Sequence, residues 1–435
     1  KSANWKRDDT IDVCVVGGGP AGVYAAYLLE GKGYNVTLFE KDSVVGGKTV
    51  PRKNPDGTEN VRHIYIAPAM KTIQRIIDYL GYSDAGVPLP LRNIYTALGQ
   101  IIPAGEASPS VESLLALNEF VNLTAPGTPI YPFAVADTNE NLPPELTVPF
   151  GEWLTANNIS EVTPLLYNII TNYGYDFIER LPAIYILHYL VFGTFPTAPW
   201  RVFPFHTVIQ ELANDLNDVR TNSEITSIKV KKDTYSKIVV DGEKDTVKCE
   251  KTIIAFPQTK DAMDIVKGLS KTAKIFDMVK YVRYYELAIE NEELAPGVIA
   301  GSTSYVQAPQ PGTVNDEPSI YLRYLDSGVV TVLFNSGYVT RSEAEVIDRV
   351  KDHIAKLWHI DVPVEDIDFF KEHTYFPHVS SEDVEAFYDG SAEIQGQSNI
   401  FFTGALFNFE LVDKAMQHAE YIVDTFFPIS CHYSF

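Results

Sequence analysis

Basic residues are scarce in this chain of 435 residues, which has 35 Lys and Arg against 57 Asp and Glu. The resulting net charge of −22 argues against binding to nucleic acid or to anionic membrane surfaces, because both attract positive charge. Apolar runs of about 18 residues, the length of a membrane-spanning helix, are also absent. The composition therefore indicates a globular protein whose length allows two or three domains.

Cysteine is rare as well, since the chain has only three. Three cysteines indicate no disulfide framework. Cys14 lies in an apolar stretch, where we expect it to pack as a small apolar side chain, whereas Cys431 could pair or stay free. No His, Cys and Asp cluster has metal-ligand spacing, and no G-x-S-x-G motif occurs. The sequence therefore predicts no metal site and no serine-hydrolase chemistry.

Two features favour the secretory pathway. The chain begins at Lys1 instead of Met, as if processed, and it carries glycosylation sequons at Asn35, Asn122 and Asn158. A glycan on Asn35 would crowd a predicted strand, whereas Asn122 and Asn158 have loop-like surroundings. We expect a secreted glycoprotein, with a cytoplasmic location as the alternative.

The most informative stretch is an apolar strand, residues 11–16, that runs into Gly17-Gly18-Gly19-Pro20-Ala21-Gly22 and then into a helical pattern. In a dinucleotide site Gly17 makes the tight turn, Gly19 lets the backbone approach the pyrophosphate, and Gly22 lets helix and strand pack closely. A second strand, residues 35–39, ends at Glu40, 23 residues after Gly17, where an acid accepts hydrogen bonds from ribose hydroxyls. Strand, turn, helix and acid in this order predict a dinucleotide-binding domain.

The residues after the acid distinguish between dinucleotides. The run Glu40-Lys41-Asp42-Ser43-Val44-Val45-Gly46-Gly47-Lys48-Thr49 resembles the second fingerprint of the amine-oxidase-like FAD flavoproteins. In that family the Gly-Gly pair passes close to the flavin and a basic residue follows, usually Arg; Lys48 keeps the charge without the planar fork. Because no second G-x-G-x-x-G occurs for a pyridine nucleotide, we expect FAD as the cofactor.

A third motif, Phe401-Phe402-Thr403-Gly404-Ala405, resembles the strand that closes the FAD site in this family. Ala405 stands where the family has an acid that contacts the ribityl chain, so that contact is either missing or supplied by another group, such as Asn408 or Glu410. Leu411 and Val412 open the last helix, whose N-terminal amides would stabilise negative charge on the flavin. The full set of expected cofactor contacts is Gly17, Gly19, Pro20, Ala21, Gly22, Glu40, Lys41, Gly47, Lys48, His63, Ile64, Ile225, Phe256, Gly404, Ala405, Leu411 and Val412. His63 could also tether the flavin covalently.

The pattern along the chain predicts an α/β (α+β) protein, with a Rossmann-like FAD-binding domain, a mixed-sheet substrate domain and a helical cap. Its expected helices are 70–80, 207–216, 342–358 and 412–427, and its expected strands include 224–230, 281–289, 319–325 and 329–334. Residues 96–150 are rich in Pro, Gly, Thr and Asn and favour long surface connections. The FAD-binding domain would combine residues 1–95, 200–265 and 385–435, leaving 96–199 for substrate domain and cap and 266–384 for the substrate sheet.

Most of the chain resembles one branch of this family, the flavoproteins that move double bonds in polyunsaturated fatty acids. The most specific match is Tyr375-Phe376-Pro377-His378-Val379-Ser380-Ser381-Glu382-Asp383. The resemblance implies that flavin N5 takes hydride from a doubly allylic CH₂ and returns it to another carbon, which leaves a conjugated product. The protein would then have to position that CH₂, exclude water and hold the carboxylate of a free fatty acid.

Aromatic residues are concentrated in residues 192–206, where they could line a lipid channel and stabilise a carbocation, although rings at this density also form cores. The candidates for catalysis are Phe195, Phe203, Tyr375 and His378. The candidates for substrate binding are Arg92, Tyr173, Tyr189, Phe192 and Trp200. Arg92 could pair with the carboxylate in a bidentate manner or be an ordinary surface arginine, and His378 could be a base or a structural hydrogen-bonding group.

Two other functions remain open. An oxidase or dehydrogenase similar to the fungal flavin oxidocyclases would act on an amine or indole-type molecule and pass electrons to O₂. The third hypothesis is a flavoprotein that serves only in binding or storage. The sequence leaves open whether the chain forms a homodimer.

Overall fold

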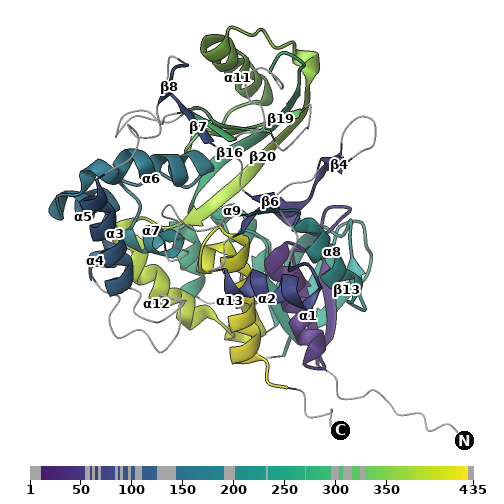
Figure 1. The fold of residues 1–435 in the computed structure, drawn as a ribbon. Coiled ribbons are helices and arrows are strands. Elements are labelled where there is room, and N and C mark those ends of the chain that lie inside the picture. Colours follow the sequence, from purple (N-terminus) through teal and green to yellow (C-terminus); the bar gives the residue numbers. More distant parts are fainter. Residues whose placement is uncertain are drawn as a thin grey trace, which may run out of the picture.

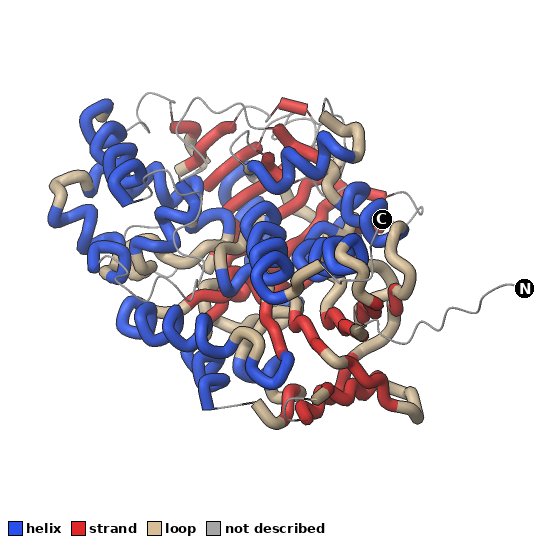
Figure 2. The backbone as a smooth tube through the Cα atoms, turned by 90° about the horizontal axis from the view of Figure 1, so that it is seen from below, coloured by secondary structure: helices blue, strands red, loops and turns tan. Residues whose placement is uncertain are grey.

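A computed structural model describes residues 11–53, 59–60, 64–66, 70–83, 87–88, 92–96, 99–102, 110–124, 144–190, 201–231, 234–269, 271–294, 303–306, 316–323 and 329–429. Strands pass through the middle of the molecule with helices packed around them (Figure 2). The chain is of the α/β class and contains a Rossmann-like dinucleotide-binding domain, as the sequence predicts.

The dinucleotide-binding domain is built on a parallel five-stranded sheet with the order β10-β2-β1-β14-β21. Its strands are β1 (Asp12–Val16), β2 (Asn35–Phe39), β10 (Val219–Arg220), β14 (Lys251–Ile254) and β21 (Ile400–Phe402). Both faces of β1, β14 and β21 are largely buried, and their sequences are nearly continuous apolar runs. The sheet thus joins segments that lie almost 400 residues apart in the sequence.

Four helices pack around this sheet: α1 (Pro20–Gly31), α2 (Lys71–Tyr79), α8 (His206–Asn214) and α13 (Val412–Phe426). They lie together in the lower right part of Figure 1, and α1 contacts both α8 and α13. The helices predicted over 70–80, 207–216 and 412–427 are therefore confirmed within two residues at their ends.

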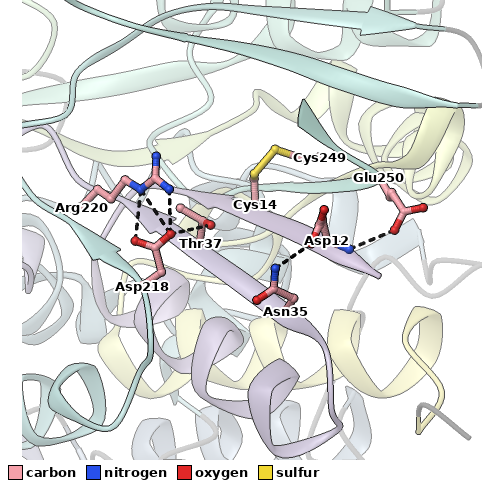
Figure 3. The surroundings of a disulfide bond; sticks show 8 residues. All are labelled: Asp12, Cys14, Asn35, Thr37, Asp218, Arg220, Cys249 and Glu250. Atoms are coloured by element: carbon pink, nitrogen blue, oxygen red, sulfur yellow. Dashed lines mark hydrogen bonds and ion pairs between the residues drawn. A yellow bond between two sulfur atoms is a disulfide. The ribbon is translucent and has the colours of Figure 1, made fainter. Parts of the chain in front are cut away.

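A second sheet, with the order β13-β12-β11-β15, is attached to this domain. It consists of β11 (Ile225–Lys231), β12 (Tyr235–Val240), β13 (Thr246–Cys249) and β15 (Val266–Lys267). Cys249 at the end of β13 forms a disulfide with Cys14 of β1 (Figure 3). The prediction of an unpaired Cys14 is wrong, because two cysteines 235 residues apart meet when β14 pairs with β1. Disulfides persist in oxidising compartments, so this bond agrees with the predicted secretion, which remains a prediction.

A seven-stranded sheet forms the other half of the molecule. Its strands, in spatial order, are β20 (Ile367–His378), β16 (Lys280–Glu290), β19 (Val329–Asn335), β18 (Glu317–Leu322), β17 (Thr303–Val306), β7 (Arg92–Tyr95) and β8 (Ile101–Ile102). Helix α11 (Glu343–Trp358) covers one face of this sheet at the top of Figure 1. Ser342 and Glu345 form a capping box that fixes its start. The other face is turned toward the rest of the molecule.

Helices form a cap at the left of Figure 1. They are α3 (Val111–Thr124), α4 (Pro144–Thr147), α5 (Phe150–Ala156), α6 (Thr163–Ile169), α7 (Ala183–Leu190) and α12 (Val384–Ile394). Helix α3 corrects the expectation that residues 96–150 form only surface connections and places Asn122 in a helix. Asn158 and Asn35 are both exposed, and the side-chain amide of Asn35 donates a hydrogen bond to Asp12.

The remaining described strands and α-helix are short. They are β3 (Arg52–Lys53) paired with β4 (Glu59–Asn60), β5 (Ile64–Ile66) and β6 (Val87–Pro88) on either side of β9 (Arg201–Phe203), and α9 (Lys260–Met263). Within the described ranges, no helix has both the length and the hydropathy needed to cross a membrane.

Candidate functional site

One cavity of about 740 Å³ joins the two halves of the molecule. One part of its lining comes from the carboxyl ends of β1, β2 and β14 and from the starts of α1 and α13. The other part comes from β16, β18, β19 and β20 of the seven-stranded sheet. The cavity therefore brings a dinucleotide-binding edge and a separate sheet face into one space.

The glycine-rich turn between β1 and α1 has a different steric constraint at each glycine. Gly17 has φ +111°, and a Cβ there would lie 2.7 Å from the backbone nitrogen of Phe256. A Cβ on Gly22 would lie 1.9 Å from the carbonyl oxygen of Gly17, so only glycine allows α1 to pack this closely. A Cβ on Gly19, by contrast, would meet no protein atom within 4 Å. This open space beside the N-terminus of α1 fits the pyrophosphate of a dinucleotide.

Glu40 ends β2 at the edge of the same cavity and is buried. Its carboxylate accepts hydrogen bonds from the backbone N–H of Gly18 at 2.7 Å and of Asp42 at 2.9 Å. These bonds hold the carboxylate in place, and its remaining lone pairs can accept from a ribose. The position agrees with the ribose contact expected from the sequence.

The opposite edge of the dinucleotide half is formed by Gly404, Ala405, Leu411 and Val412, all of which line the cavity. Helix α13 starts here, and the unpaired amides of its first turn favour negative charge nearby. Of the two possible replacements for the missing acid at Ala405, only Glu410 lines the cavity. The side-chain amide of Asn408 is buried and donates to the carbonyl of Lys414.

Lys48 and Glu410, which both line the cavity, form an ion pair with Nζ and Oε1 2.8 Å apart. The Lys48 ammonium also lies 4.9 Å from the centre of the Tyr375 ring. The other Glu410 oxygen accepts from the backbone N–H of Phe376 at 3.0 Å. These contacts connect the second FAD fingerprint with the Tyr375–Asp383 motif, which lies more than 320 residues later.

Aromatic rings cover the sheet beside this ion pair. Tyr375 stacks on Tyr284 with 4.9 Å between ring centres, and Tyr175 lies 5.8 Å from Tyr375. All three rings line the cavity, together with Tyr173. Burial raises the pKa of the Tyr175 hydroxyl well above its usual value, so it stays protonated and donates to the carbonyl oxygen of Glu410.

Glu286 and His373 are cavity residues that sequence reasoning missed. Glu286 lies on β16 and His373 on β20, and the Oε2 of Glu286 is 3.1 Å from the Nε2 of His373. The side chain of Glu286 is only 10% exposed and that of His373 only 7%. In β16, residues 285, 287 and 289 face α11, so the alternation of a strand places 284 and 286 on the cavity face. This alternation is visible in the sequence, but the pairing with His373 depends on the strand register.

The expected cofactor residues gather at the dinucleotide half. Those that line the cavity are Gly17, Gly19, Pro20, Ala21, Glu40, Lys41, Gly47, Lys48, Ile225, Phe256, Gly404, Ala405, Leu411 and Val412. Gly22 does not line the cavity but allows α1 to pack closely against the turn, as described above. His63 lies outside the described residues, and only the backbone of Ile64, in β5, is described.

The expected catalytic and substrate residues divide differently. Tyr173 and Tyr375 line the cavity, whereas Phe192, Phe195 and Trp200 lie outside the described residues. Tyr189 is buried behind the wall, with its ring 5.6 Å from that of Tyr175. Arg92 is described only as a backbone position in β7.

Phe203 and His378 are placed away from the cavity lining, which does not support a catalytic role for either. Phe203 is fully buried and packs against Tyr82 and Phe205 in the core of the dinucleotide-binding domain. An aromatic segment at a domain junction cannot by its composition show which rings face a cavity.

His378 belongs to a buried network with Asp176. Its Nε2 lies 3.3 Å from an Asp176 oxygen and its Nδ1 lies 2.7 Å from the carbonyl oxygen of Phe376. His378 and Arg180 favour the charged carboxylate and hold the pKa of Asp176 well below its usual range, although burial opposes this shift. The network supports Phe376, whose φ of +48° is unusual for a bulky residue, directly after Tyr375. His378 is therefore buried in a hydrogen-bonded network, and its part in the reaction stays a prediction.

No group of three or more His, Cys, Asp or Glu side chains suited to hold a metal ion occurs among the residues that the structure describes.

Comparison with known proteins identifies similar chains. Residues 15–82 match the NAD(P)-binding Rossmann-like domain family. An uncharacterized protein of Acanthamoeba polyphaga mimivirus is 26% identical, with 96% of this chain and 94% of that protein covered. An FAD-dependent oxidoreductase of Colletotrichum higginsianum is 24% identical over 91% of this chain and 89% of that protein.

Two solved structures share the fold over nearly the whole chain. A CLA-producing fatty acid isomerase from P. acnes superimposes with a TM-score of 0.81 at 24% identity, covering 95% of this chain and 98% of that one. Putrescine oxidase superimposes with a TM-score of 0.67 at 15% identity, covering 96% and 99%.

Proposed function

We propose that this chain, an FAD-dependent enzyme with the fold of the amine-oxidase-like flavoproteins, shifts double bonds of a polyunsaturated fatty acid to give a conjugated product. The observation that carries the proposal is the continuous cavity that runs from the dinucleotide-binding edge to a sheet face with tyrosines and leucines. The structural similarity to a fatty acid isomerase supports the same assignment.

Different residues of the chain would bind the cofactor and the substrate. Bound FAD supplies a group that can accept a hydride from the substrate and return it. Gly17, Gly19 and Glu40 would hold the cofactor, and the first turn of α13 would stabilise negative charge on it.

The wall of the seven-stranded sheet would hold the substrate. Leu322 and Leu333 offer apolar surface that excludes water, and the faces of Tyr284 and Tyr375 attract positive charge that develops on the carbon chain. The Lys48–Glu410 ion pair lies beside Tyr375 and keeps its ring next to the cofactor half.

The strand register supports Arg92 as the carboxylate anchor. Thr331 pairs with Leu322, Leu322 with Thr303, and Thr303 with Arg92. Thr331 and Leu322 line the cavity, so one cross-strand row leads from the cavity to the backbone position of Arg92. Three strand steps span about 14 Å, a distance that an extended acyl chain can bridge.

Substitution of Arg92 tests the anchor. Arg92→Ala should raise KM for free polyunsaturated acids about tenfold or more while leaving KM for their methyl esters nearly unchanged, because only the free acid carries a charge to pair. Steady-state kinetics on both substrate forms measure this difference. Equal changes for acid and ester would remove Arg92 from the binding site.

The reaction itself is tested by incubating the FAD-loaded protein with linoleic, arachidonic and eicosapentaenoic acids and recording ultraviolet absorbance. Conjugated diene or triene should accumulate without consumption of O₂. A flavin-loaded protein that leaves all three acids unchanged would contradict the proposal.

Oxidation of an amine or indole-type molecule is the second candidate, because the sequence relatives include an FAD-dependent oxidoreductase and the fold is shared with putrescine oxidase. In that case O₂ would accept the electrons, and peroxide would form in step with product. Measurement of peroxide during turnover distinguishes the two functions.

A further inference from the structure

The Glu286–His373 pair has no task in the hydride shift described above, yet it occupies the wall of the reaction cavity. The pair lies between tyrosines on one side and leucines on the other: Tyr284 and Tyr375 are two residues away along the same strands, and Glu286 is directly opposite Leu333 on β19. Among the described residues of the seven-stranded sheet that line the cavity, Glu286 and His373 are the ionisable acid and base, and their neighbours are tyrosines, leucines, threonines and a proline.

Burial of such a pair is costly, and well-packed apolar side chains of similar volume are often as stable. If the cavity bound only hydrocarbon at this point, leucine at both positions would serve equally well. The presence of the pair indicates that the cavity receives a polar group here.

The charges around the pair determine what kind of group fits. Two basic side chains among the described lining residues each have an acidic neighbour: His373 has Glu286 at 3.1 Å, and Lys48 has Glu410 at 2.8 Å. A carboxylate at His373 would add negative charge beside Glu286 in a buried site, which electrostatics opposes. A neutral hydroxyl can donate to a Glu286 oxygen, because a carboxylate accepts more than one hydrogen bond.

We propose that Glu286 and His373 form a recognition site for an uncharged oxygen group, such as a hydroxyl, carried along the chain of the substrate. This inference rests on the proposed function in taking the ligand to be a long-chain acid. The backbone position of Arg92 is four strands from Glu286, about 19 Å across the sheet. The oxygen group would therefore lie far along the chain from the carboxylate, and the preferred substrate would be an oxygenated polyunsaturated acid.

Saturated ligands test the site without turnover, because they have no doubly allylic CH₂. We would titrate the FAD-loaded protein with stearic acid and with hydroxystearic acids that differ in hydroxyl position, following both the flavin absorbance and the heat of binding. At least one positional isomer should bind about tenfold more tightly than stearic acid, which corresponds to about 1.4 kcal/mol. The double variant Glu286→Leu/His373→Leu should reduce this ratio to within twofold.

Arg283 and Glu372 provide a matched control. They form an ion pair between the same two strands, β16 and β20, but do not line the cavity. The variant Arg283→Gln/Glu372→Gln should keep the preference for the hydroxylated ligand. If the double leucine variant does not fold, Glu286→Gln keeps the side-chain shape and should still lower the ratio at least threefold, since it weakens the acceptor.

Three results would overturn the proposal: no positional isomer binds better than stearic acid, the preference survives removal of the pair, or removal weakens stearic acid more than methyl stearate. The last result would show that the pair holds the carboxylate. Binding is measured apart from catalysis. A failure of the linoleic acid assay would therefore contradict the proposed function, while the binding experiment would still test the recognition site.

Discussion

The two halves of the cavity are encoded in different ways. The cofactor half depends on residues that are close in sequence, with Gly17, Gly19 and Gly22 within six positions and Glu40 soon after. The substrate half takes Tyr284, Glu286, Leu333 and His373 from strands that meet only through antiparallel pairing. A local motif therefore identifies the cofactor, whereas the nature of the substrate depends on how distant strands are aligned.

The largest effect is expected where the motif supports the fold itself. Gly22→Val should prevent formation of a folded flavoprotein, because even the first added carbon would overlap the carbonyl oxygen of Gly17. We expect a loss of more than about 4 kcal/mol in unfolding free energy. Circular dichroism and the flavin-to-protein absorbance ratio measure it.

Gly31→Ala is the matched control, since a Cβ at this end of α1 meets no atom within 4 Å. This variant should fold and bind FAD normally. If Gly22→Val did so too, the close helix–strand packing would not be required.

Gly19→Val separates cofactor binding from folding. The space next to Gly19 contains no protein atom, so the apoprotein should keep its thermal stability. The added side chain would occupy the room for the pyrophosphate, and FAD content should fall at least tenfold. Normal flavin content in this variant would place the cofactor elsewhere in the cavity.

The disulfide lies in the dinucleotide-binding domain, where it joins β1 to the end of β13. Cys14→Ser/Cys249→Ser should lower the unfolding free energy by about 2–4 kcal/mol, because the bond closes a loop of more than 200 residues in the unfolded chain. Thermal denaturation of protein produced in an oxidising compartment measures the loss. Cys431→Ser is the control and should melt at the wild-type temperature, and an equally stable double variant would argue against the disulfide in solution.

The smallest effects compare two buried histidines, one in the helix that covers the seven-stranded sheet and one in the last helix of the dinucleotide-binding domain. Burial lowers the pKa of His353 in α11 to about 4 and that of His418 in α13 to about 3. The unfolded chain therefore takes up these protons at higher pH than the folded protein. The stability they contribute is complete above about pH 6.5 and is lost as the pH falls toward 4 or 3.

By pH 5 each histidine should cost about 2 kcal/mol, at about 1.4 kcal/mol per pH unit. His353→Gln and His418→Gln should each make the decrease in Tm between pH 7 and pH 5 smaller than in the wild type. An unchanged decrease in either variant would show that its histidine is accessible to protons in the folded state.

Sequence patterns predicted the cofactor half because its steric requirements are local. The turn at Gly17, the acid at Glu40 and the start of α13 all lie where the motifs place them. The same reasoning could not place Phe203, which is in the core, or pair Cys14 with Cys249. Each of these depends on which distant segment packs next to it, and local sequence patterns do not show that.

The sequence by itself determined the dinucleotide fold, since tight turns, close backbone approach and helix ends constrain neighbouring residues, and its resemblance to the FAD flavoproteins indicated the cofactor. Only the tertiary structure decided which side chains face the substrate. Strand alternation allows two faces for each residue, and the register between β16, β19 and β20 brings Glu286, Leu333 and His373 together in one wall.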